Sequence, residues 1–372
     1  MKIIVFGNYP EWLINFRGSL MQEMVRQGDE VIACAPHADS RIISRLSDIG
    51  VSYRNIPVCR DGFYFTKDVA TIYQFFRLLK EEKPDMVFLY TIKPIIFGTI
   101  SARFAKIQKI SSMIEGLGYV FTGNGNLRKI RKSVVMSLYK AVLCLNFRIF
   151  FLNPDDRMFF IQKRLCTRRK SVLLNGTGVN LQHYFPCPSA GTTSVSFILA
   201  ARLLKEKGVY EYARAAESIK RHYPDAVFYL AGWIDDMPSA IDEKDLESWI
   251  RSGVIHYLGY CSDIRNALAK SSVFVLPSYY REGLPRTIQE AMAMAKPVIT
   301  TDMPGCRETV QDGMNGFIIP CRDVGQLIDR MERFLENKSL ISSMGWNGRK
   351  LAEQKYDEKK INQKIIATLK SV

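Results

Sequence analysis

The sequence has few of the side chains that build metal centres and disulfide frameworks. Its eight cysteines form no CxxC pair and come no closer than fifteen positions to one another, and its four histidines are scattered and fall in no HExxH motif. A structural zinc site and a disulfide-rich fold are therefore not expected, and reduced thiols in a cytoplasmic protein fit this pattern. We predict no metal site and no resident cofactor.

The sequence also lacks an apolar run long enough to cross a membrane. Its longest apolar stretch, residues 133–152, is broken by Lys140, Asn146 and Arg148. A spanning helix needs about twenty nearly continuous apolar residues. The first apolar run of the chain is only five residues long, which is too short for a signal peptide. A chain without a membrane span is therefore expected.

Negative charge is scarce in the first half. Residues 1–180 carry 27 Lys and Arg against 14 Asp and Glu, a net charge of +13, whereas residues 181–372 carry 25 against 23, a net charge of +2. The run 126–170 contains twelve basic residues and only two acids, Asp155 and Asp156. Such a field attracts polyanions, which include nucleic acid, an anionic membrane surface and phosphorylated substrates. A solvated face without a partner is the other interpretation.

Short apolar runs alternate with longer stretches of helical periodicity along the whole chain. This alternation is typical of parallel sheets that have helices on both faces. The predicted strands lie at 2–7, 30–35, 51–58, 85–90, 110–116, 148–153 and 171–175 in the first half, and at 195–200, 226–232, 254–259, 272–277, 296–300 and 315–320 in the second.

A segment rich in Gly, Pro, Ser and Thr, residues 175–194, separates the two series. We interpret it as a linker between two doubly wound Rossmann-like domains, with the boundary at 178/179. A single eight-fold barrel is disfavoured, because a linker interrupts the series of strands. Ligands of open α/β sheets bind beyond the carboxyl ends of the strands, so a cleft faced by both domains is the expected site. The loop after the first strand, residues 7–16, should face that cleft.

Four charged residues of the second half stand where predicted strands end. Arg202 and Lys207 follow the strand 195–200, and two cations at a strand end suit a pyrophosphate. Glu282 lies in the loop after the strand 272–277, and Glu290 lies inside the helix that follows, which is predicted to start near Pro285 and run to about residue 295. Exposed charged turns without a function are the alternative interpretation.

A longer pattern surrounds the two glutamates. A strand ending in LPS precedes an acid, a glycine, a hydrophobic residue and a proline, and then come a second acid and the pattern A.A...PVI. This resembles the donor-site motif of the retaining glycosyltransferases of family 4, which have the GT-B fold. ARLLKEKG and GTGVNLQHYFP resemble further segments of this family. EGLGYVF and YTIKPIIFG resemble those of members that extend lipid-linked polysaccharides, so the resemblance covers nearly the whole chain.

The resemblance implies a role for each matching position. Arg202 and Lys207 would clamp the donor pyrophosphate, Glu290 would bind the ribose, and Glu282 would hold the donor sugar. The backbone at Gly283, Leu284 and Pro285 would assist Glu282, and the base would lie near Tyr257, Leu258 and Tyr260. The catalytic candidates are Glu282, Arg202, Lys207 and Lys93. The implied domains are an acceptor-binding domain at 1–178 and a donor-binding domain at 179–355, with a last helix within 356–372 that packs back on the first domain.

The sequence departs from the family pattern in the first domain. Many relatives carry a glycine-rich loop after the first strand, whereas this chain reads GNYPEWLINFRG, and no histidine lies between positions 38 and 182. Lys93 is the nearest polar candidate for the missing histidine, and a purely structural role for it is the alternative. The residues expected to bind the acceptor are Asn8, Asn15, Glu115, Gly116 and Tyr119. A front-side reaction is implied, in which a donor phosphate oxygen takes the acceptor proton and protein cations do the work of Mg²⁺.

The implied activity is transfer of a hexose or N-acetylhexosamine from a nucleotide-sugar, UDP preferred over GDP. The implied acceptor is a polyprenyl-diphosphate-linked saccharide in capsule, O-antigen or similar glycan assembly. The enzyme would be cytoplasmic and peripheral on the inner face of the plasma membrane, which the run 126–170 would contact. An epimerase or hydrolase of the same fold is the alternative, although such enzymes need acid/base groups that the histidine-free first domain does not offer. Nucleic acid is not expected as a partner, because no RRM, zinc-knuckle or helix-turn-helix signature is found.

Overall fold

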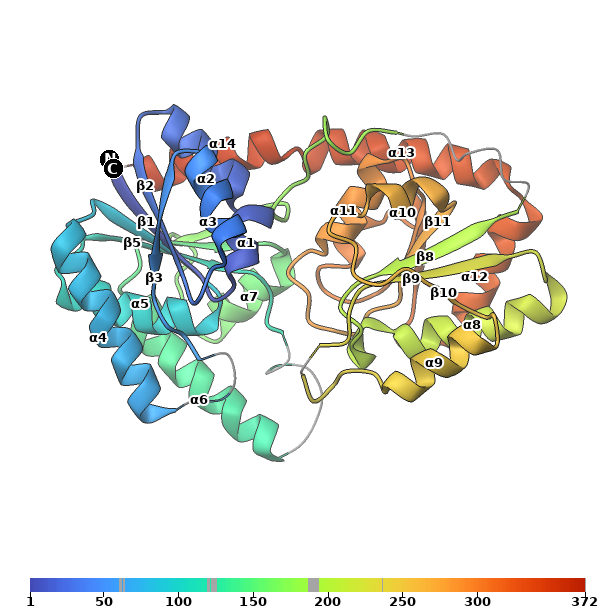
Figure 1. Cartoon of the computed structure of the whole chain (residues 1–372), viewed down its shortest axis with the longest axis horizontal. Coiled ribbons are helices and arrows are strands. Elements are labelled where there is room, and N and C mark those ends of the chain that lie inside the picture. The colour runs from blue at the N-terminus through green and yellow to red at the C-terminus, as the bar shows by residue number, and fades with distance from the viewer. Residues whose placement is uncertain are drawn as a thin grey trace. The chain divides into compact units, whose positions relative to one another are not determined.

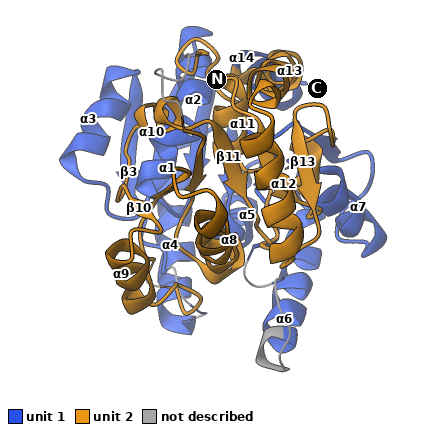
Figure 2. Cartoon of the chain, turned by 90° about the vertical axis from the view of Figure 1, so that its right-hand side faces the viewer, with its two compact units in different colours: residues 1–177, 359–372 blue, residues 178–358 orange. Residues whose placement is uncertain are grey.

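The computed structural model describes residues 1–59, 62, 64–118, 121, 126–186, 194–235 and 237–371. The chain forms two compact units (Figures 1 and 2). Unit 1 comprises Met1–Thr177 and Lys359–Val372, and unit 2 comprises Gly178–Glu358. Within the described ranges, no helix combines the length and apolar character that a membrane span requires.

Unit 1 is built on a parallel sheet with seven strands in its described part. The inner strands are almost wholly buried apolar runs, as expected for a sheet that is covered on both faces, whereas the edge strand Val51–Asn55 is largely exposed. Their order is β3 (Val51–Asn55), β2 (Glu30–Ala35), β1 (Lys2–Phe6), β4 (Met86–Tyr90), β5 (Lys109–Ile114), β6 (Arg148–Phe151) and β7 (Ser171–Leu173).

Four helices of unit 1 share a single core with alternate residues of these strands. They are α4 (Phe65–Glu82), α5 (Ile92–Phe104), α6 (Asn126–Leu143) and α7 (Pro154–Gln162). The core unites Ile4 and Phe6 of β1 with Phe75 of α4 and Phe160 of α7. The remaining helices are α1 (Pro10–Asn15), α2 (Gly18–Arg26), α3 (Ser40–Asp48) and α14 (Glu358–Lys370).

Helix α14 returns the end of the chain to unit 1. Asn362 donates a hydrogen bond to the Ser19 hydroxyl at 3.0 Å, and the Lys370 ammonium lies 2.7 Å from an Asp29 carboxylate oxygen. Figure 1 shows α14 beside α2, the helix that contains Ser19. These contacts join the last helix to α2 and to the turn between α2 and β2.

The segment after β1 differs from its prediction. Residues 7–16 were expected to form a loop, but α1 occupies Pro10–Asn15. Pro10 stands at the start of this helix, where its missing N–H costs nothing, and Glu11 lies in the first turn, where it complements the helix dipole. A helix of six residues is too short to produce a clear periodicity in the sequence.

Unit 2 repeats the architecture with six parallel strands in its described part. Their order is β10 (His256–Tyr257), β9 (Val227–Ala231), β8 (Ser196–Ala200), β11 (Val273–Leu276), β12 (Val298–Thr301) and β13 (Gly316–Ile319). The helices are α8 (Val209–His222), α9 (Glu243–Arg251), α10 (Arg265–Lys270), α11 (Arg286–Ala293), α12 (Val324–Glu336) and α13 (Ser339–Lys355), with short 3-10 turns η2 (Lys205–Lys207) and η3 (Arg307–Thr309).

Every predicted strand is present, and both units are doubly wound α/β domains. The predicted fold class is confirmed in this respect. Because β8 and β11 are parallel neighbours at the centre of unit 2, the loops that follow them leave the same edge of the sheet.

Candidate active site

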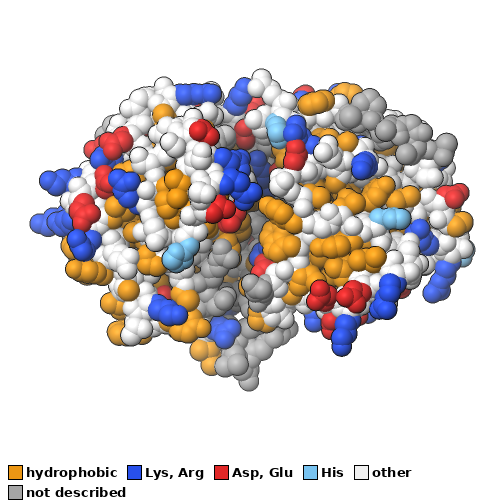
Figure 3. All heavy atoms as spheres, in the orientation of Figure 1, with side chains coloured by type: hydrophobic (Ala, Val, Ile, Leu, Met, Phe, Trp, Pro, Cys, Tyr) orange, Lys and Arg blue, Asp and Glu red, His pale blue; other side chains and the backbone are white. Residues whose placement is uncertain are grey.

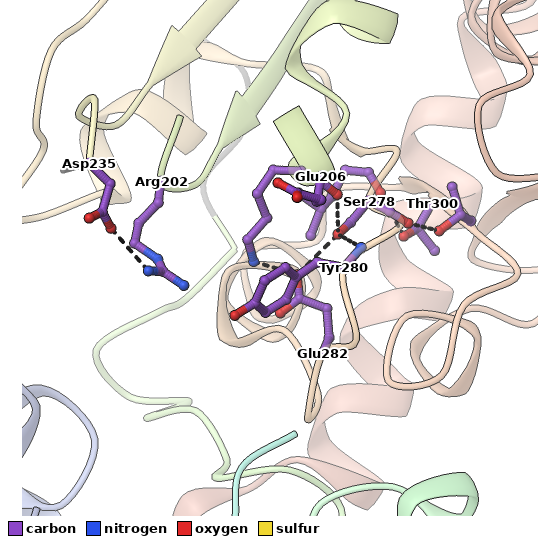
Figure 4. Close-up of polar contacts among 10 residues, drawn as sticks. Arg202, Glu206, Asp235, Ser278, Tyr280, Glu282 and Thr300 are labelled. Carbon is purple, nitrogen blue, oxygen red and sulfur yellow. Dashed lines mark hydrogen bonds and ion pairs between the residues drawn. The ribbon is translucent and has the colours of Figure 1, made fainter. Parts of the chain in front are cut away.

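The centre of the candidate site is an ion pair at the carboxyl edge of the unit 2 sheet. Lys207 comes from η2, which follows β8, and Glu282 comes from the loop that follows β11. The Lys207 ammonium contacts the Glu282 carboxylate, and each residue is only 9% exposed (Figure 4). A buried pair of this kind holds both groups in fixed positions, because separating them would leave a desolvated charge.

Ser278 contacts the same carboxylate oxygen of Glu282 as Lys207 does. Its hydroxyl lies 3.1 Å from the Glu282 carboxylate and 3.2 Å from the Glu206 carbonyl oxygen (Figure 4). The same hydroxyl accepts the Tyr280 N–H at 3.2 Å. The aromatic ring of Tyr280 lies 5.1 Å from the Lys207 ammonium. The loop after β11 is thus tied to the turn after β8.

A glycine makes this close approach possible. Gly208 follows η2 with a φ of +78°, a conformation that favours glycine. A Cβ at this position would lie 2.3 Å from the Pro277 carbonyl oxygen. The backbone just after β11 can therefore lie this close to the start of α8 only because residue 208 has no side chain.

Arg202 has a partner of its own two residues after β8. Its guanidinium donates to the Asp235 carboxylate at 3.0 Å, and both side chains are about one-fifth exposed (Figure 4). Asp235 follows β9, the neighbour of β8 on the other side. Arg202 and Lys207 thus stand at the same sheet edge, as predicted, with different carboxylates beside them.

Glu290 lies in α11 and is also buried, at 8% exposure. Arg286, one turn earlier, donates to its carboxylate at 3.1 Å, and the Tyr184 side chain lies near it. Burial raises the pKa of the Glu290 carboxyl, and the charge of Arg286 opposes this shift. Burial also raises the pKa of the Tyr184 hydroxyl, and the nearby Glu290 charge adds to that shift.

Gly283, Leu284 and Pro285 form the buried entry to α11. Pro285 precedes the first helical residue, and the helix ends at Ala293, two residues before the predicted end. Ala295 adopts a φ of +56°, which is incompatible with a continuing helix. The first N–H groups of a helix lack intrahelical acceptors, so this entry can donate hydrogen bonds to a polar ligand.

The segment predicted to lie near the nucleotide base, residues 257–260, lies at one edge of the unit 2 sheet. Tyr257 ends β10 and donates its hydroxyl to the Gly232 carbonyl oxygen at 2.8 Å, while the Leu258 N–H bonds the Leu230 carbonyl at 2.8 Å. Tyr260 is 59% exposed and packs edge-on against Trp233, with ring centroids 5.3 Å apart. This exposed aromatic pair can stack against a planar ligand.

In unit 1, two predicted residues, Asn8 and Glu115, lie at the carboxyl edge of the sheet together with Thr91, which was not predicted. Asn8, Thr91 and Glu115 follow β1, β4 and β5, which are adjacent strands. Buried oxygen atoms of these side chains, Asn8 Oδ1, Thr91 Oγ1 and Glu115 Oε2, have no hydrogen-bond partner among the described residues, and the Tyr90 hydroxyl has none either. Unsatisfied buried polar atoms are costly, so this group is suited to a polar ligand.

Arg17 organises this edge, although no motif or spacing in the sequence singled it out. The residue is 1% exposed, its guanidinium contacts the Glu115 carboxylate, and it lies 4.9 Å from the centre of the Tyr90 ring. Burial raises the pKa of the Glu115 carboxyl, and the charge of Arg17 opposes this shift. Gly116, next along the chain, has a φ of +117°.

The other unit 1 candidates lie elsewhere or cannot be described. Asn15 is exposed at the end of α1. Lys93 is 6% exposed and donates to Asp68 of α4 at 2.8 Å, so it joins α5 to α4 inside unit 1. Tyr119 lies outside the described residues. The position of Lys93 favours a structural role.

Several contributors to the site were missed by the sequence interpretation. Arg286 carried a readable signal, because a base four residues before an acid on a helix forms an ion pair. Asp235, Tyr184 and Trp233 carried none, since only the tertiary fold brings them to the site. Within the described ranges, no group of three or more His, Cys, Asp or Glu side chains is arranged to hold a metal ion.

Comparison with solved structures identifies the fold. The crystal structure of Anabaena HepE in complex with UDP and glucose superposes with a TM-score of 0.80 over 100% of both chains, at 18% sequence identity. Two doubly wound units in this order constitute the GT-B fold, which is therefore the fold of this chain.

Sequence comparison identifies the family. The family described as glycosyl transferases group 1 matches residues 189–351. EpsD of Bacillus subtilis, whose name places it among the glycosyltransferases, is 31% identical over 315 residues, covering 80% of this chain and 79% of that protein. N,N'-diacetylbacillosaminyl-diphospho-undecaprenol alpha-1,3-N-acetylgalactosaminyltransferase of Campylobacter jejuni is 27% identical over 378 residues, covering 98% of this chain and 97% of that protein. This chain belongs to the group 1 glycosyl transferases.

Proposed function

We propose that this glycosyltransferase moves a hexose or N-acetylhexosamine from a UDP-sugar to a polyprenyl-diphosphate-linked saccharide, with retention of the anomeric configuration. The observation that supports binding of the nucleotide-sugar donor is the buried Lys207–Glu282 pair at the ends of neighbouring strands. The name of the Campylobacter relative, which contains both a diphospho-undecaprenol acceptor and an N-acetylhexosamine, supports the acceptor half.

The donor is proposed to bind along the carboxyl edge of the unit 2 sheet. Arg202 and Lys207 neutralise its pyrophosphate, and Glu290 accepts hydrogen bonds from the ribose hydroxyls. Glu282 accepts hydroxyls of the sugar, assisted by the backbone of the entry to α11. UDP is preferred over GDP, a choice supported by the HepE complex with UDP. The exposed rings of Trp233 and Tyr260 provide a surface for the base.

The acceptor is proposed to bind at the carboxyl edge of the unit 1 sheet. Sugar hydroxyls donate and accept hydrogen bonds, and the unpaired oxygen atoms of Asn8, Thr91 and Glu115 offer complementary partners. Arg17 keeps the Glu115 carboxylate in place. Residues 126–170 supply a basic surface for anionic lipid, which makes the protein a peripheral enzyme of the inner face of the plasma membrane.

The proposed reaction needs no protein nucleophile. The bond between the anomeric carbon and the UDP phosphate oxygen breaks, and the acceptor hydroxyl attacks the same face of the sugar. The acceptor proton passes to the departing phosphate oxygen. Arg202 and Lys207 stabilise the negative charge that develops on UDP, and no metal ion is required.

The test is to incubate the enzyme with UDP-sugars and an undecaprenyl-diphosphate-linked monosaccharide and to follow UDP release and the lipid-linked product. We expect product only when both substrates are present, an α linkage from an α-linked donor, and activity that survives EDTA. A β-linked product would contradict retention, and loss of activity in EDTA would contradict metal independence.

An epimerase or hydrolase of the same fold would act on the nucleotide-sugar alone. Analysis of the UDP-sugar after incubation without acceptor separates the two functions. An epimer or free sugar that forms as fast as product does in the complete reaction would replace the transferase proposal.

A further inference from the structure

Helix α4 of unit 1 is apolar on two faces. One face, which includes Phe75, Leu78 and Leu79, is buried in the core beside the sheet. The second face carries large apolar residues at a helical spacing of 4, 3, 1 and 3 positions, and they are Phe65, Val69, Ile72, Tyr73 and Phe76. A helix that packs on a single core needs only the first face, so the second requires a separate explanation.

The second face of α4 continues onto the end of α5 and encloses a groove. Val69, Ile72, Tyr73, Phe76 and Phe104 line a groove of about 360 Å³. Within the described part of the chain the rim stays open to solvent, because Phe65 is 84% exposed, Phe104 70% and Tyr73 58%. Such contiguous exposed aromatic residues mark an interaction surface rather than ordinary scatter. We call these six residues, Phe65 and the five that line the groove, the α4/α5 apolar patch.

Basic residues surround this patch. On α4, α5 and the turns that follow them, only two acids are exposed, Glu81 and Asp85, against six exposed cations. Figure 3 shows hydrophobic side chains and Lys or Arg side chains next to one another over α4, at the lower left. The six exposed cations are Lys67, Arg77, Lys80, Lys83, Arg103 and Lys106.

Buried polar contacts hold the patch rigidly. The Asp68 carboxylate accepts hydrogen bonds from the Lys93 ammonium at 2.8 Å and from the Tyr64 N–H at 2.9 Å. These bonds fix the first turn of α4 against α5. The Ser101 hydroxyl of α5 donates to the Ile72 carbonyl at 2.8 Å. The aromatic side chains are therefore presented on a preformed surface, and binding costs little ordering of the backbone.

We propose that the α4/α5 apolar patch inserts into the interfacial region of an anionic lipid bilayer and anchors the enzyme there. Aromatic side chains with cations around them match a bilayer interface, where rings reach the acyl boundary and Lys or Arg remain at anionic head groups. A second copy of this chain is disfavoured as occupant, because two basic rims would face each other. The proposal deepens the proposed function, since it adds an apolar anchor to the basic surface 126–170.

Helix α6 extends the same surface. Helix α5 packs against both α4 and α6. Near its start α6 alternates exposed Lys129 and Arg131 with Ile130, which is 61% exposed, and Val134, which is 45% exposed. Stable association with a bilayer takes two signals, and the patch with the basic run provides both an apolar and an electrostatic one.

The first test replaces the three most exposed residues of the patch, as Phe65→Ser, Tyr73→Ser and Phe104→Ser in one variant. A matched control carries Ile250→Ser, Met314→Ser and Trp346→Ser, residues of unit 2 that are 42–55% exposed. Co-sedimentation with phosphatidylcholine–phosphatidylglycerol vesicles gives the partition coefficient. We expect a loss of about tenfold or more for the patch variant and none for the control. Equal partitioning of the patch variant and the wild type would overturn the proposal.

The oligomeric state and the depth of insertion decide between occupants. Sedimentation velocity should give a monomer mass for wild type and patch variant alike. A wild-type dimer that dissociates in the variant would assign the patch to a second copy and overturn the proposal. A Phe104→Trp variant should be quenched by lipids with brominated chains, and a Met314→Trp control should not. Absence of quenching at position 104 would exclude insertion even if the triple variant folds poorly.

These measurements use neither donor nor acceptor. A failed transferase assay with intact vesicle binding would therefore count against the proposed function alone. Intact transfer to a water-soluble acceptor analogue, together with unchanged vesicle binding in the patch variant, would count against the anchor alone.

Discussion

Glu282 and Glu290 stand eight positions apart and meet different partners in unit 2. Glu282 contacts the Lys207 ammonium and the Ser278 hydroxyl at the ends of neighbouring strands. Glu290 lies a turn inside α11, against Arg286 and Tyr184. Because the two carboxylates are held by separate groups, each can be changed without removing the support of the other. This separation allows the proposed sugar and ribose roles to be tested one at a time.

Glu290→Gln should weaken binding of the nucleoside and remove its dependence on pH. Because its pKa is raised, Glu290 in the folded protein takes up a proton at a higher pH than an ordinary glutamate does. Uridine affinity of the wild type should therefore rise with pH through this elevated range, because the carboxylate is the stronger acceptor. Loss of a hydrogen bond to a charged group costs about 1.5–3 kcal/mol, or about tenfold or more in affinity.

Isothermal titration with uridine, which carries no titrating phosphate, checks this prediction. The free energy of unfolding adds a second readout. A carboxyl with a raised pKa in the folded state loses stability as pH rises from its unfolded pKa through the raised value, and the Gln variant should lack that loss. Parallel pH profiles for wild type and variant would argue against the role of Glu290.

Glu282→Gln should reduce turnover and spare nucleotide binding. The carboxylate is proposed to contact the sugar and to position Lys207, so its loss affects stabilisation of the developing charge. We expect kcat to fall by about 100-fold and the Kd for UDP to stay within about threefold. Steady-state kinetics and UDP titration of the two glutamate variants side by side provide the comparison. Equal losses of UDP affinity in both variants would contradict the division of roles.

At the scale of elements, the site depends on how closely the turn after β8 approaches the end of β11. Gly208 makes this approach possible, with a φ of +78° and the Pro277 carbonyl oxygen 2.3 Å from the place of a Cβ. Gly253 has a similar φ of +69°, but no atom lies within 4 Å of its Cβ position. Substituting each glycine in turn therefore separates the effect of backbone conformation from the effect of steric overlap.

Gly208→Ala should destabilise the protein by about 1–3 kcal/mol and lower the affinity for UDP. The overlap forces η2 away from β11 and displaces Lys207 from Glu282. Gly253→Ala should cost only the smaller penalty of its positive φ and leave UDP binding unchanged. Urea unfolding and UDP titration of both variants make the measurement. Wild-type UDP affinity in Gly208→Ala would mean that Lys207 does not depend on this packing.

The elements themselves could be read from the sequence because buried parallel strands are continuous apolar runs. All predicted strands from residues 2–7 to 315–320 are found, usually within two residues of their ends. Helix α1 was not predicted, because six residues are too few to show a helical periodicity. At the site, the charged residues after β8 and β11 could be selected by type and position. Asp235 and Arg17 could not, because their contacts join segments 33 and 98 positions apart that only the fold brings together.

At the scale of the whole molecule, charge is divided between the two units. Unit 1 has 31 Lys and Arg against 14 Asp and Glu, a net charge of +17. Unit 2 has 21 against 23, a net charge of −2. The return of the last residues to unit 1 adds four lysines to the basic unit and no acid. The surface proposed to bind anionic lipid and the proposed donor site therefore lie on different units, so a change of charge in one should spare the other.

Reversal of exposed charge on unit 1 should reduce the salt dependence of vesicle binding. The four substitutions are Lys129→Glu, Arg131→Glu, Arg168→Glu and Arg169→Glu, which lower the net charge of unit 1 by eight. Each cation near an anionic surface contributes about 1 kcal/mol, so affinity for phosphatidylglycerol vesicles at low salt should fall by more than about 100-fold. Wild-type binding should weaken steeply as salt is raised, because screening shortens the range of the attraction. Residual binding of the variant should depend much less steeply on salt, because only the cations around the α4/α5 apolar patch remain near the lipid.

The matched control reverses four exposed cations of unit 2, and they are Arg214, Arg221, Lys244 and Arg251. It should keep both the affinity and the salt dependence of the wild type, and UDP affinity should be unchanged in both variants. The patch variant supplies the complementary case, since it should lose affinity yet retain a steep salt dependence. If the unit 2 control weakens vesicle binding as much as the unit 1 variant does, net charge governs binding and no surface of unit 1 has a special role. If only the two unit 1 variants lose vesicle affinity, and only the charge-reversal variant also loses much of its salt dependence, then the electrostatic and apolar contributions are separable. Both contributions would then belong to unit 1.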